Sequence, residues 1–371
     1  MTAISPERRI QRLQGVMAKT GDDAFLAFSP NWRRDHVRFL AGFNTIGNWS
    51  FALLLPGGEV AAFVEHFWDR ERVARESWAR EVYGGSEVLP ALADLLGRAK
   101  VRSVGVVGIE LMETRFVEAL KRVPHLAVRS VTKAVEALRM VKEPEEIELM
   151  RAGARVADLG FQALIRSSRV GTREYEVMAE VEAAVRAEGA EDNFMLMASG
   201  GIEVTAMRAP GTRRLQRGDV VISEITPQIR GYYAQVCRTL IVGEPSPVQE
   251  KSFDIFLRAQ QAALDVLRPG VTMAEVALAQ NRVFESEGFG EYTTRKYTRV
   301  RGHHLGLHPD ESPPLLEDEP TVAQVGMTLI AHPNTYLPLA GYMVFGDPLL
   351  VTETGCVRLN SIERKLFVSE G

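Results

Sequence analysis

Four of the seven histidines in this chain lie within residues 303–332. They are His303, His304, His308 and His332, and Asp310 and Glu311 lie beside the third of them. Imidazole and carboxylate groups can exchange protons near neutral pH and can bind divalent metals. Because several polar rings are costly to bury together without a polar cavity, the segment predicts a functional site.

A second set of polar side chains lies on a predicted β-hairpin over residues 219–238. Alternate strand residues share a face, so Glu224 ends an otherwise apolar face, while Gln235 and Cys237 share a face of the partner strand. His332 likewise ends an apolar predicted strand. A polar residue at such a place either meets solvent at the rim of the sheet or lines a cleft. Cys237 has no evident base or helix N-terminus beside it, so we expect an inert buried thiol.

Composition narrows the classes of function. The 371 residues are 46% hydrophobic and 25% charged, which is ordinary for a globular chain of about two domains. A formal net charge of -4 offers no field that would collect nucleic acid or anionic lipid. No apolar run approaches a membrane span, no signal segment opens the sequence, and two cysteines allow no disulfide framework. We therefore expect a cytoplasmic protein with a small-molecule substrate and neither nucleic-acid nor membrane partners.

The hydrophobic pattern divides the chain near residue 135. Residues 1–134 alternate between helical and strand-like patterns and predict a small α/β domain. Pro144, followed by two acidic residues, predicts the start of a helix with a long apolar stripe. Further along residues 135–371, β-rich patterns interrupted by two helical stretches predict helices packed on a mostly antiparallel sheet. The expected fold class is α+β.

Several short motifs follow one another in a recognisable order. They are the linker 138–147, Ala198-Ser199-Gly200, Gly231-Tyr232 with Arg238-Thr239, residues 268–271, Gly302-His303 with Gly306, Glu311 with Pro313, Gly326-Met327, and Thr352 with Gly355. Together they resemble the pita-bread fold of the creatinase, aminopeptidase P and prolidase family over nearly the whole chain. The resemblance implies a pita-bread catalytic domain preceded by a smaller creatinase-like N-terminal domain, and a homodimer.

The resemblance also allows the metal ligands to be compared. Metal-dependent members of this family hold two divalent ions with two Asp, one His and two Glu residues. The matching positions here are Glu224, Gln235, His303, His332 and Gly346, so that only the histidine is unchanged. Two adjacent divalent ions need bridging carboxylates to offset their repulsion. These replacements therefore argue against a dinuclear site.

The expected function is a creatinase-like hydrolase that cleaves a C–N bond of a small polar, carboxylate-bearing substrate by side-chain acid-base chemistry. No cofactor is expected. The expected catalytic residues are Glu224, His303, His332, Asp310 and Glu311. The expected substrate-binding residues are Gln235, Arg301, His304, His308, Tyr232, Met207 and Arg208. Met207 and Asp310 match two further histidines of the family peptidases, and the arginines could bind a carboxylate bidentately.

Three alternatives remain open. In the first, Glu224, His303 and His332 bind one divalent metal ion, with Gln235 nearby. In the second, the chain is a non-catalytic pita-bread binding protein. The third, an Xaa-Pro dipeptidase, is placed last because most of the metal-binding carboxylates are missing. A shift of one residue in the match at Gly346 would bring in Asp347 and restore one carboxylate.

Overall fold

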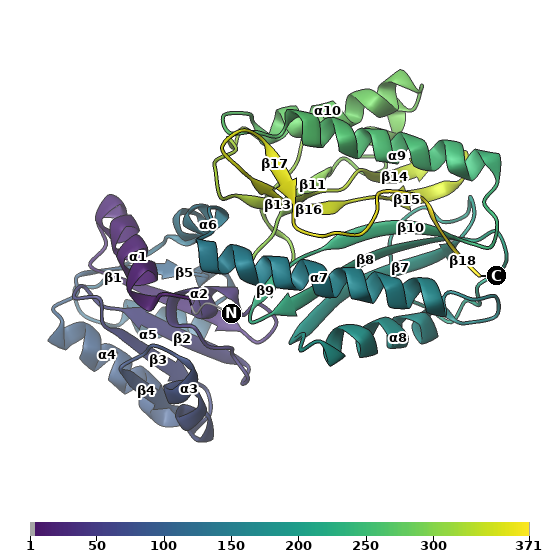
Figure 1. The fold of residues 1–371 in the computed structure, drawn as a ribbon. Coiled ribbons are helices and arrows are strands. Elements are labelled where there is room, and N and C mark those ends of the chain that lie inside the picture. Colours follow the sequence, from purple (N-terminus) through teal and green to yellow (C-terminus); the bar gives the residue numbers. More distant parts are fainter. Residues whose placement is uncertain (1–3, 371) are drawn as a thin grey trace. The chain divides into compact units, whose positions relative to one another are not determined.

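The computed structural model describes residues 4–370, and the chain divides into two compact units between Arg139 and Met140 (Figure 1). Residues 1–3 of the expected N-terminal domain and residue 371 of the expected catalytic domain lie outside the described residues. Helices and strands occur in both units, which confirms the α+β class. Among the described residues, no helix combines the length and apolar composition of a membrane span.

The N-terminal unit is a six-stranded sheet with helices packed against it. The strands, in the order β4-β3-β2-β1-β5-β6, are Glu81–Gly84, Val60–Val64, Trp49–Leu54, Ala24–Pro30, Ser103–Val107 and Ala127–Ser130. The helices are α1 (Pro6–Thr20), α2 (Asp35–Ala41), α3 (Arg70–Glu76), α4 (Val88–Arg98), α5 (Thr114–Lys121) and α6 (Thr132–Met140). β1 pairs antiparallel with β2 and parallel with β5, so the sheet is mixed. Buried aromatic rings fill its core, with Phe51 and Phe116 packed edge to face at 5.0 Å.

A buried histidine on α2 makes the stability of this unit depend on pH. His36 is 2% exposed, and its Nδ1 lies 3.6 Å from the carboxylate of Asp35, to which Arg139 also binds. Burial is the main reason that the pKa of His36 falls from 6.5 to about 4. Arg139 and Arg33 lower this pKa further, whereas Asp35 and Glu110 oppose the shift.

We expect the free energy of unfolding of this unit to fall by about 2 kcal/mol between pH 7 and pH 5. The reason is that the unfolded chain, with its histidine pKa near 6.5, takes up the proton before the folded chain does. All four tryptophans, Trp32, Trp49, Trp68 and Trp78, lie in this unit, so urea denaturation followed by tryptophan fluorescence reports on it directly. In His36→Gln the same pH change should have a smaller effect. Equal pH slopes in the two proteins would contradict this account.

The second unit contains two larger sheets and a small hairpin. The first sheet runs β18 (Phe367–Ser369), β10 (Val236–Val242), β8 (Val220–Ile229) and β7 (Asp192–Gly200), with β9 (Tyr232–Tyr233) also paired to β8. The second runs β12 (Glu311–Pro314), β11 (Gly302–His304), β13 (Thr328–Ala331), β16 (Asp347–Val351) and β17 (Cys356–Arg358). The hairpin pairs β14 (Asn334–Leu337) with β15 (Gly341–Val344).

Four helices cover these sheets. They are α7 (Pro144–Ser167), α8 (Glu174–Ala187), α9 (Pro247–Val266) and α10 (Met273–Ser286), and a short 3-10 helix spans Gly290–Thr293. Figure 1 shows α9 and α10 on one side of the sheets and α7 and α8 on the other. The helix start expected at Pro144 is confirmed, because the side chain of Glu146 accepts a hydrogen bond from the Glu143 N–H and completes a capping box. The sheets between the helix pairs supply the residues of the candidate site.

The predicted hairpin at residues 219–238 forms, but its second strand is interrupted. Tyr232 and Tyr233 pair with the end of β8, the chain then leaves the ladder, and pairing resumes when Val236 meets Ile225. Gln235 lies in this interruption, directly before β10. The interruption cannot be read from the alternating pattern, because it depends on where the long strand β8 finds its partners.

The two sheets meet at Cys237 and Gly346. The N–H of Cys237 on β10 donates to the carbonyl of Gly346, and the N–H of Gly346 donates back to the Cys237 carbonyl, both at 3.0 Å. Next to this contact, Arg238 and Asp347 form a fully buried ion pair at 2.5 Å. This junction brings residues that lie far apart in the sequence close to β8.

Candidate active site

Glu224 and Cys237 are direct neighbours across the β8–β10 ladder. Glu224 is 7% exposed and Cys237 is fully buried. The side-chain amide of Gln235 donates a 3.3 Å hydrogen bond to Glu224 Oε2. The other end of that amide, Gln235 Oε1, is buried and has no hydrogen-bond partner among the described residues. The first sheet thus offers a carboxylate, a thiol and an amide oxygen at one place.

His332 reaches the same place from the second sheet. It directly follows β13, and its N–H donates a 3.0 Å hydrogen bond to the carbonyl of Arg301. A Cβ atom on Gly346 would lie 2.5 Å from the Cβ of His332 and 3.1 Å from the carbonyl oxygen of Ala331. The backbone at residue 346 therefore approaches His332 so closely that a side chain there would collide with it. Both ring nitrogens of His332 are buried without a hydrogen-bond partner in the described part of the chain.

Glu224, Cys237 and His332 form a group of the kind that binds metals, which we call the metal-type group. One ligand atom from each lies within 4.8 Å of the other two. Carboxylate, thiolate and imidazole are all zinc ligands, so these residues would be able to hold such an ion. His303 lies beside the group, and the centroids of the His303 and His332 rings are 5.2 Å apart.

Burial controls the protonation of this group. It raises the pKa of Glu224 to about 7, with the charge of Asp310 adding to the shift and the thiol of Cys237 opposing it. Burial also raises the pKa of Cys237 well above its ordinary value, and the charge of Glu224 adds to that. The pKa of His332 is well below its ordinary value for the same reason, with the charges of His303 and Arg301 adding. A divalent cation between these groups would favour the carboxylate and thiolate forms.

One ring nitrogen of His303 is held in a hydrogen bond, and the other is available as an acceptor. Its Nδ1 lies 3.0 Å from the carbonyl oxygen of His304, which can only accept, so Nδ1 carries the proton and Nε2 is an acceptor. Asp310 Oδ1 lies 3.6 Å from the same Nδ1. Gly302 (φ 143°) sets the ring's position, because a Cβ there would lie 2.0 Å from the Ile330 carbonyl oxygen on β13. This close approach of β11 to β13 keeps His303 near His332.

Glu311, expected to be catalytic, holds the loop before β12. One of its oxygens lies 3.1 Å from the buried Nζ of Lys142. The other accepts hydrogen bonds from the N–H groups of Leu307 at 2.9 Å and His308 at 3.4 Å. Glu311 is therefore not a member of the metal-type group, whose residues lie on β8, on β10 and directly after β13.

The remaining histidines of the cluster also contact their own segment. His304 is fully buried with Nδ1 2.9 Å from the carbonyl of Pro313, and burial lowers its pKa to about 4. Strand alternation turns it to the opposite face from His303. His308 Nδ1 lies 2.9 Å from the carbonyl oxygen of Asp310, which can only accept, so Nδ1 donates to it. The histidines that were expected to act together are thus divided between the two faces of β11 and the loop after it.

The arginine expected to bind a substrate carboxylate lies in the interior. Arg301 is fully buried, with its Nε donating to Asn281 Oδ1 at 2.6 Å and its Nη1 donating to the Asn334 carbonyl at 3.1 Å. Burial lowers the pKa of Arg301 to about 10. Through these contacts it joins α10 to the start of β14.

Three other expected substrate-binding residues have contacts elsewhere. The hydroxyl of Tyr232 donates to Glu146 Oε1 at the start of α7, at 2.6 Å. Arg208 forms a 2.8 Å ion pair with Glu174 at the start of α8. Met207, beside it, is half-buried. The structure brings Glu224, Gln235, His303 and His332 together, whereas the hydroxyl of Tyr232 and the guanidinium of Arg208 bind acidic residues at the starts of two helices.

Asp347 does not replace the missing carboxylate. It is fully buried and binds Arg238 at 2.5 Å, Asn360 at 2.8 Å, Gln260 at 3.0 Å and Arg358 at 3.1 Å. Although burial raises it, Arg238 and Arg358 hold the pKa of Asp347 below its ordinary value. Residue 346, whose hypothetical Cβ would meet His332, is therefore the position that faces the site.

Sequence reasoning missed Cys237. The pattern did place this thiol on the same strand face as Gln235 and opposite the strand of Glu224, which was the available signal. What it lacked was the register that makes Cys237 the direct neighbour of Glu224. Tyr342 on β15 is a further neighbour, because the charges of Glu224 and Cys237 help burial to raise its pKa.

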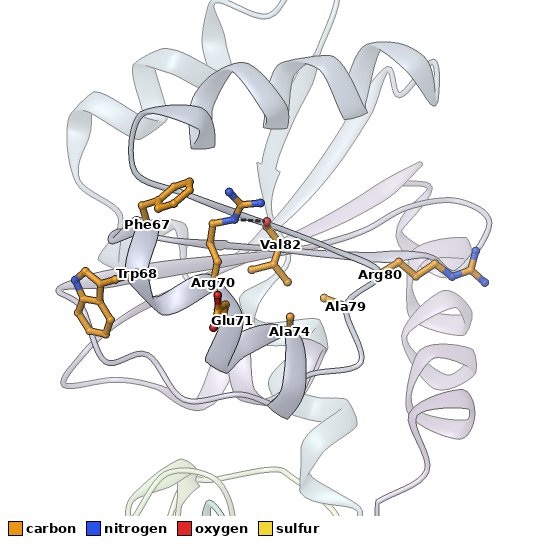
Figure 2. Close-up of a pocket in the computed structure, with 8 residues that line it drawn as sticks. All are labelled: Phe67, Trp68, Arg70, Glu71, Ala74, Ala79, Arg80 and Val82. Atoms are coloured by element: carbon orange, nitrogen blue, oxygen red, sulfur yellow. Dashed lines mark hydrogen bonds between the residues drawn. The ribbon is translucent and has the colours of Figure 1, made fainter.

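A surface pocket of about 560 Å³ lies in the N-terminal unit (Figure 2). It is lined by Phe67, Trp68, Arg70, Glu71, Ala74, Ala79, Arg80 and Val82. Figure 2 shows Arg70 held by a hydrogen bond from its Nε to the Val82 carbonyl, at 3.0 Å. The pocket contains no member of the metal-type group, so it does not compete with the second unit as the site of chemistry.

Fold and site together define a two-domain protein whose second domain holds buried metal-type ligands where two sheets meet. Metallopeptidase family M24 matches residues 148–353, and the creatinase/prolidase N-terminal domain matches residues 9–141. The chain therefore belongs to metallopeptidase family M24 and carries this N-terminal domain before it. The resemblance to the creatinase, aminopeptidase P and prolidase family, and the pita-bread fold that it implied, are confirmed.

Known relatives agree with this assignment. The Xaa-Pro dipeptidase of Pyrococcus furiosus is 30% identical over 241 residues, covering 64% of this chain and 68% of that protein. The solved prolidase from Pyrococcus furiosus matches with a TM-score of 0.81 and 25% identity, covering 95% of this chain and 100% of that one. The X-Pro aminopeptidase from Thermotoga maritima shares the fold, with a TM-score of 0.87 and 22% identity over 97% of this chain and 99% of that one.

These findings correct the expected function. The expectation of a metal-free, creatinase-like hydrolase, with an Xaa-Pro dipeptidase placed last, is wrong, because the family is one of metallopeptidases and similar proteins are named Xaa-Pro dipeptidase and prolidase. The expectation of a hydrolase is confirmed at the level of the family. The expected absence of a cofactor has no support. The physical reason for the error is that the missing carboxylates were given too much weight and Cys237 was given no part in metal binding, although a thiolate can be a metal ligand.

The residues present fit one metal ion and do not fit two. Gln235 is neutral, and a side chain on Gly346 would collide with His332. For one ion, the fit rests on the three converging donors and on buried atoms that lack partners in the described residues, namely the ring nitrogens of His332 and Oε1 of Gln235. Buried polar atoms without partners are costly, and a bound cation would satisfy them.

Proposed function

We propose that this protein is a metal-dependent hydrolase that cleaves the amide bond of a small, dipeptide-like substrate at the group formed by Glu224, Cys237 and His332. The observation that carries the proposal is the convergence of these buried donors, with both ring nitrogens of His332 unpartnered among the described residues. The substrate class is supported by similarity to an Xaa-Pro dipeptidase and to a prolidase.

The chain's own residues have separable tasks in this proposal. Glu224, Cys237 and His332 would hold the ion, and Gln235 orients Glu224 through its 3.3 Å hydrogen bond. A divalent ion, when bound, supplies Lewis acidity towards a carbonyl and lowers the pKa of water. His303 accepts a proton at Nε2, since its Nδ1 already donates to the His304 carbonyl. Asp310, with Oδ1 3.6 Å from Nδ1, stabilises the resulting imidazolium.

A substrate panel assayed with and without metal tests this function. The protein, purified without chelator, is incubated with dipeptides that carry proline or another residue in the second position. We expect hydrolysis of at least one of these classes, loss of that activity after dialysis against a chelator, and recovery when about one equivalent of a divalent ion is added. Equal hydrolysis before and after metal removal, or no hydrolysis of any dipeptide by metal-loaded protein, would contradict the proposal.

The proposal extends to a cytoplasmic homodimer acting on a small molecule. Both cysteines are free thiols, which suits a reducing compartment. The homodimer rests on the resemblance to a family whose members pair. Sedimentation velocity measures it, and a species at the 41.1 kDa mass of one chain would contradict it.

A further inference from the structure

The geometry points to Cys237 as a thiolate ligand of a single metal ion held together with Glu224 and His332, in a centre that prefers zinc-class ions to hard ions such as Mn²⁺ and Mg²⁺. This inference rests on the proposed function and specifies the metal of the same site. No comparison and no expectation from the sequence assigned a role to this thiol.

The backbone fixes where the thiol points. Cys237 pairs directly with Glu224, and directly opposed residues of an antiparallel ladder project from the same face with Cβ atoms about 5 Å apart. Both backbone polar groups of Cys237 are bound to Gly346, at 3.0 Å each. The backbone at Cys237 is therefore held from two sides, and its Sγ is directed to the side of the Glu224 carboxylate.

His332 completes the group from the other sheet. Its Cβ lies 2.5 Å from where a Cβ on Gly346 would be, and Gly346 is the residue hydrogen-bonded to Cys237. The imidazole and the thiol thus converge at the junction of the two sheets. The ring is buried, and neither nitrogen has a hydrogen-bond partner in the described residues. An unsatisfied imidazole in the interior, next to a thiol and a carboxylate, is the arrangement expected of a metal ligand set.

The charge of the ligands limits how many metal ions the site can hold, and the type of ligand determines which class of ion it prefers. One carboxylate and one thiolate carry two negative charges, which neutralise one divalent cation and leave nothing for a second. Gln235 adds a neutral oxygen, and residue 346 adds no ligand. Thiolate is a soft ligand that favours zinc and similar ions, whereas Mn²⁺ and Mg²⁺ prefer sites made of oxygen ligands.

The chain contains its own matched control. The second cysteine, Cys356 on β17, is half-buried, and its Sγ lies 3.6 Å from the carbonyl of Leu264 on α9. It is not a member of the metal-type group. Replacing either cysteine with serine removes one sulfur from the same protein, but only Cys237→Ser removes a proposed ligand.

Cobalt substitution tests the inference without measuring activity. The metal-free full chain is titrated with Co²⁺, and the near-ultraviolet charge-transfer band of a cobalt–thiolate bond is recorded. We expect this band to saturate at about one equivalent in the wild type and in Cys356→Ser, and to be absent in Cys237→Ser. A band that persists in Cys237→Ser, or saturation at two equivalents, would overturn the inference.

Two further measurements keep the test decisive. X-ray absorption of the zinc-loaded wild type requires no variant, and a metal–sulfur distance of about 2.3 Å is expected. Cys237→Asp supplies an oxygen ligand and should shift the ratio of Mn²⁺ to Zn²⁺ affinity at least about 10-fold towards Mn²⁺. Metal-dependent dipeptide hydrolysis without any metal–sulfur signal overturns this inference and removes Cys237 from the residues proposed to hold the ion, but leaves the metal-dependent hydrolysis standing. Failure of the wild type to bind any divalent ion overturns both.

Discussion

Replacing His332 with alanine is expected to lower kcat/KM for the dipeptide substrate by more than about 100-fold. Loss of a residue that merely supports a metal ligand typically costs 10- to 100-fold in metal affinity or activity, and a ligand should cost more. His332 is the donor with both nitrogens unpartnered among the described residues, so no other role in the fold competes for them. The variant should also lose bound metal after gel filtration.

The measurement is kcat/KM at a fixed, saturating concentration of divalent ion, together with metal content per chain and a far-ultraviolet circular dichroism spectrum. His125→Asn is the matched control, because His125 is an exposed histidine of the N-terminal unit. Asparagine also tolerates the left-handed conformation (φ 62°) found at that position. A His332→Ala protein that keeps its metal and retains activity within about threefold of the wild type would rule out this assignment.

Replacing Asp347 with alanine is expected to lower the free energy of unfolding by about 3 to 5 kcal/mol. The variant leaves the fully buried guanidinium of Arg238 without its carboxylate, and Arg358 loses a contact at 3.1 Å. Breaking one half of a buried ion pair costs this much because the remaining charge stays away from water. Because Asp347 directly follows Gly346, the loss should also loosen the junction between the two sheets.

Urea denaturation followed by far-ultraviolet circular dichroism measures this cost. Asp254→Ala is the control, because Asp254 pairs with Arg258 one helical turn away on α9, at 2.7 Å, and both side chains are about half exposed. Exposed pairs of this kind contribute less than about 1 kcal/mol. If Asp347→Ala and Asp254→Ala shifted the denaturation midpoint equally, the junction would not have the stabilising role assigned to it.

The secondary structure around the site was largely determined by local sequence. Pro144 and the acids after it predicted the start of α7, and the capping box of Glu143 and Glu146 confirms it. Alternation predicted the hairpin at residues 219–238, and β8 and β10 form it. These signals are readable because helix capping and strand alternation involve residues within a few positions of one another.

The makeup of the site was decided by tertiary structure. The sequence pattern predicted site residues that the structure does bring together, namely Glu224, Gln235, His303 and His332. It also grouped His304, His308 and Glu311 with them, because these residues are close in the chain. The structure gives the two histidines contacts within their own segment, and Glu311 contacts the same segment and Lys142. Neighbours in sequence separate because successive residues of a strand point to opposite faces, and nearness along the chain is therefore a poor guide to nearness of side chains.

Local sequence thus determined the fold, whereas tertiary packing determined which residues form the candidate metal site. The sequence by itself determined the two-domain α+β architecture and the strand that carries Glu224, because periodicity and turn residues act locally. The register of β8 against β10 decided that Cys237 meets Glu224, and only the packing of the two sheets decided that His332 joins them. His332 and Glu224 lie about 100 positions apart in the chain, and no local pattern encodes the register of one sheet against another.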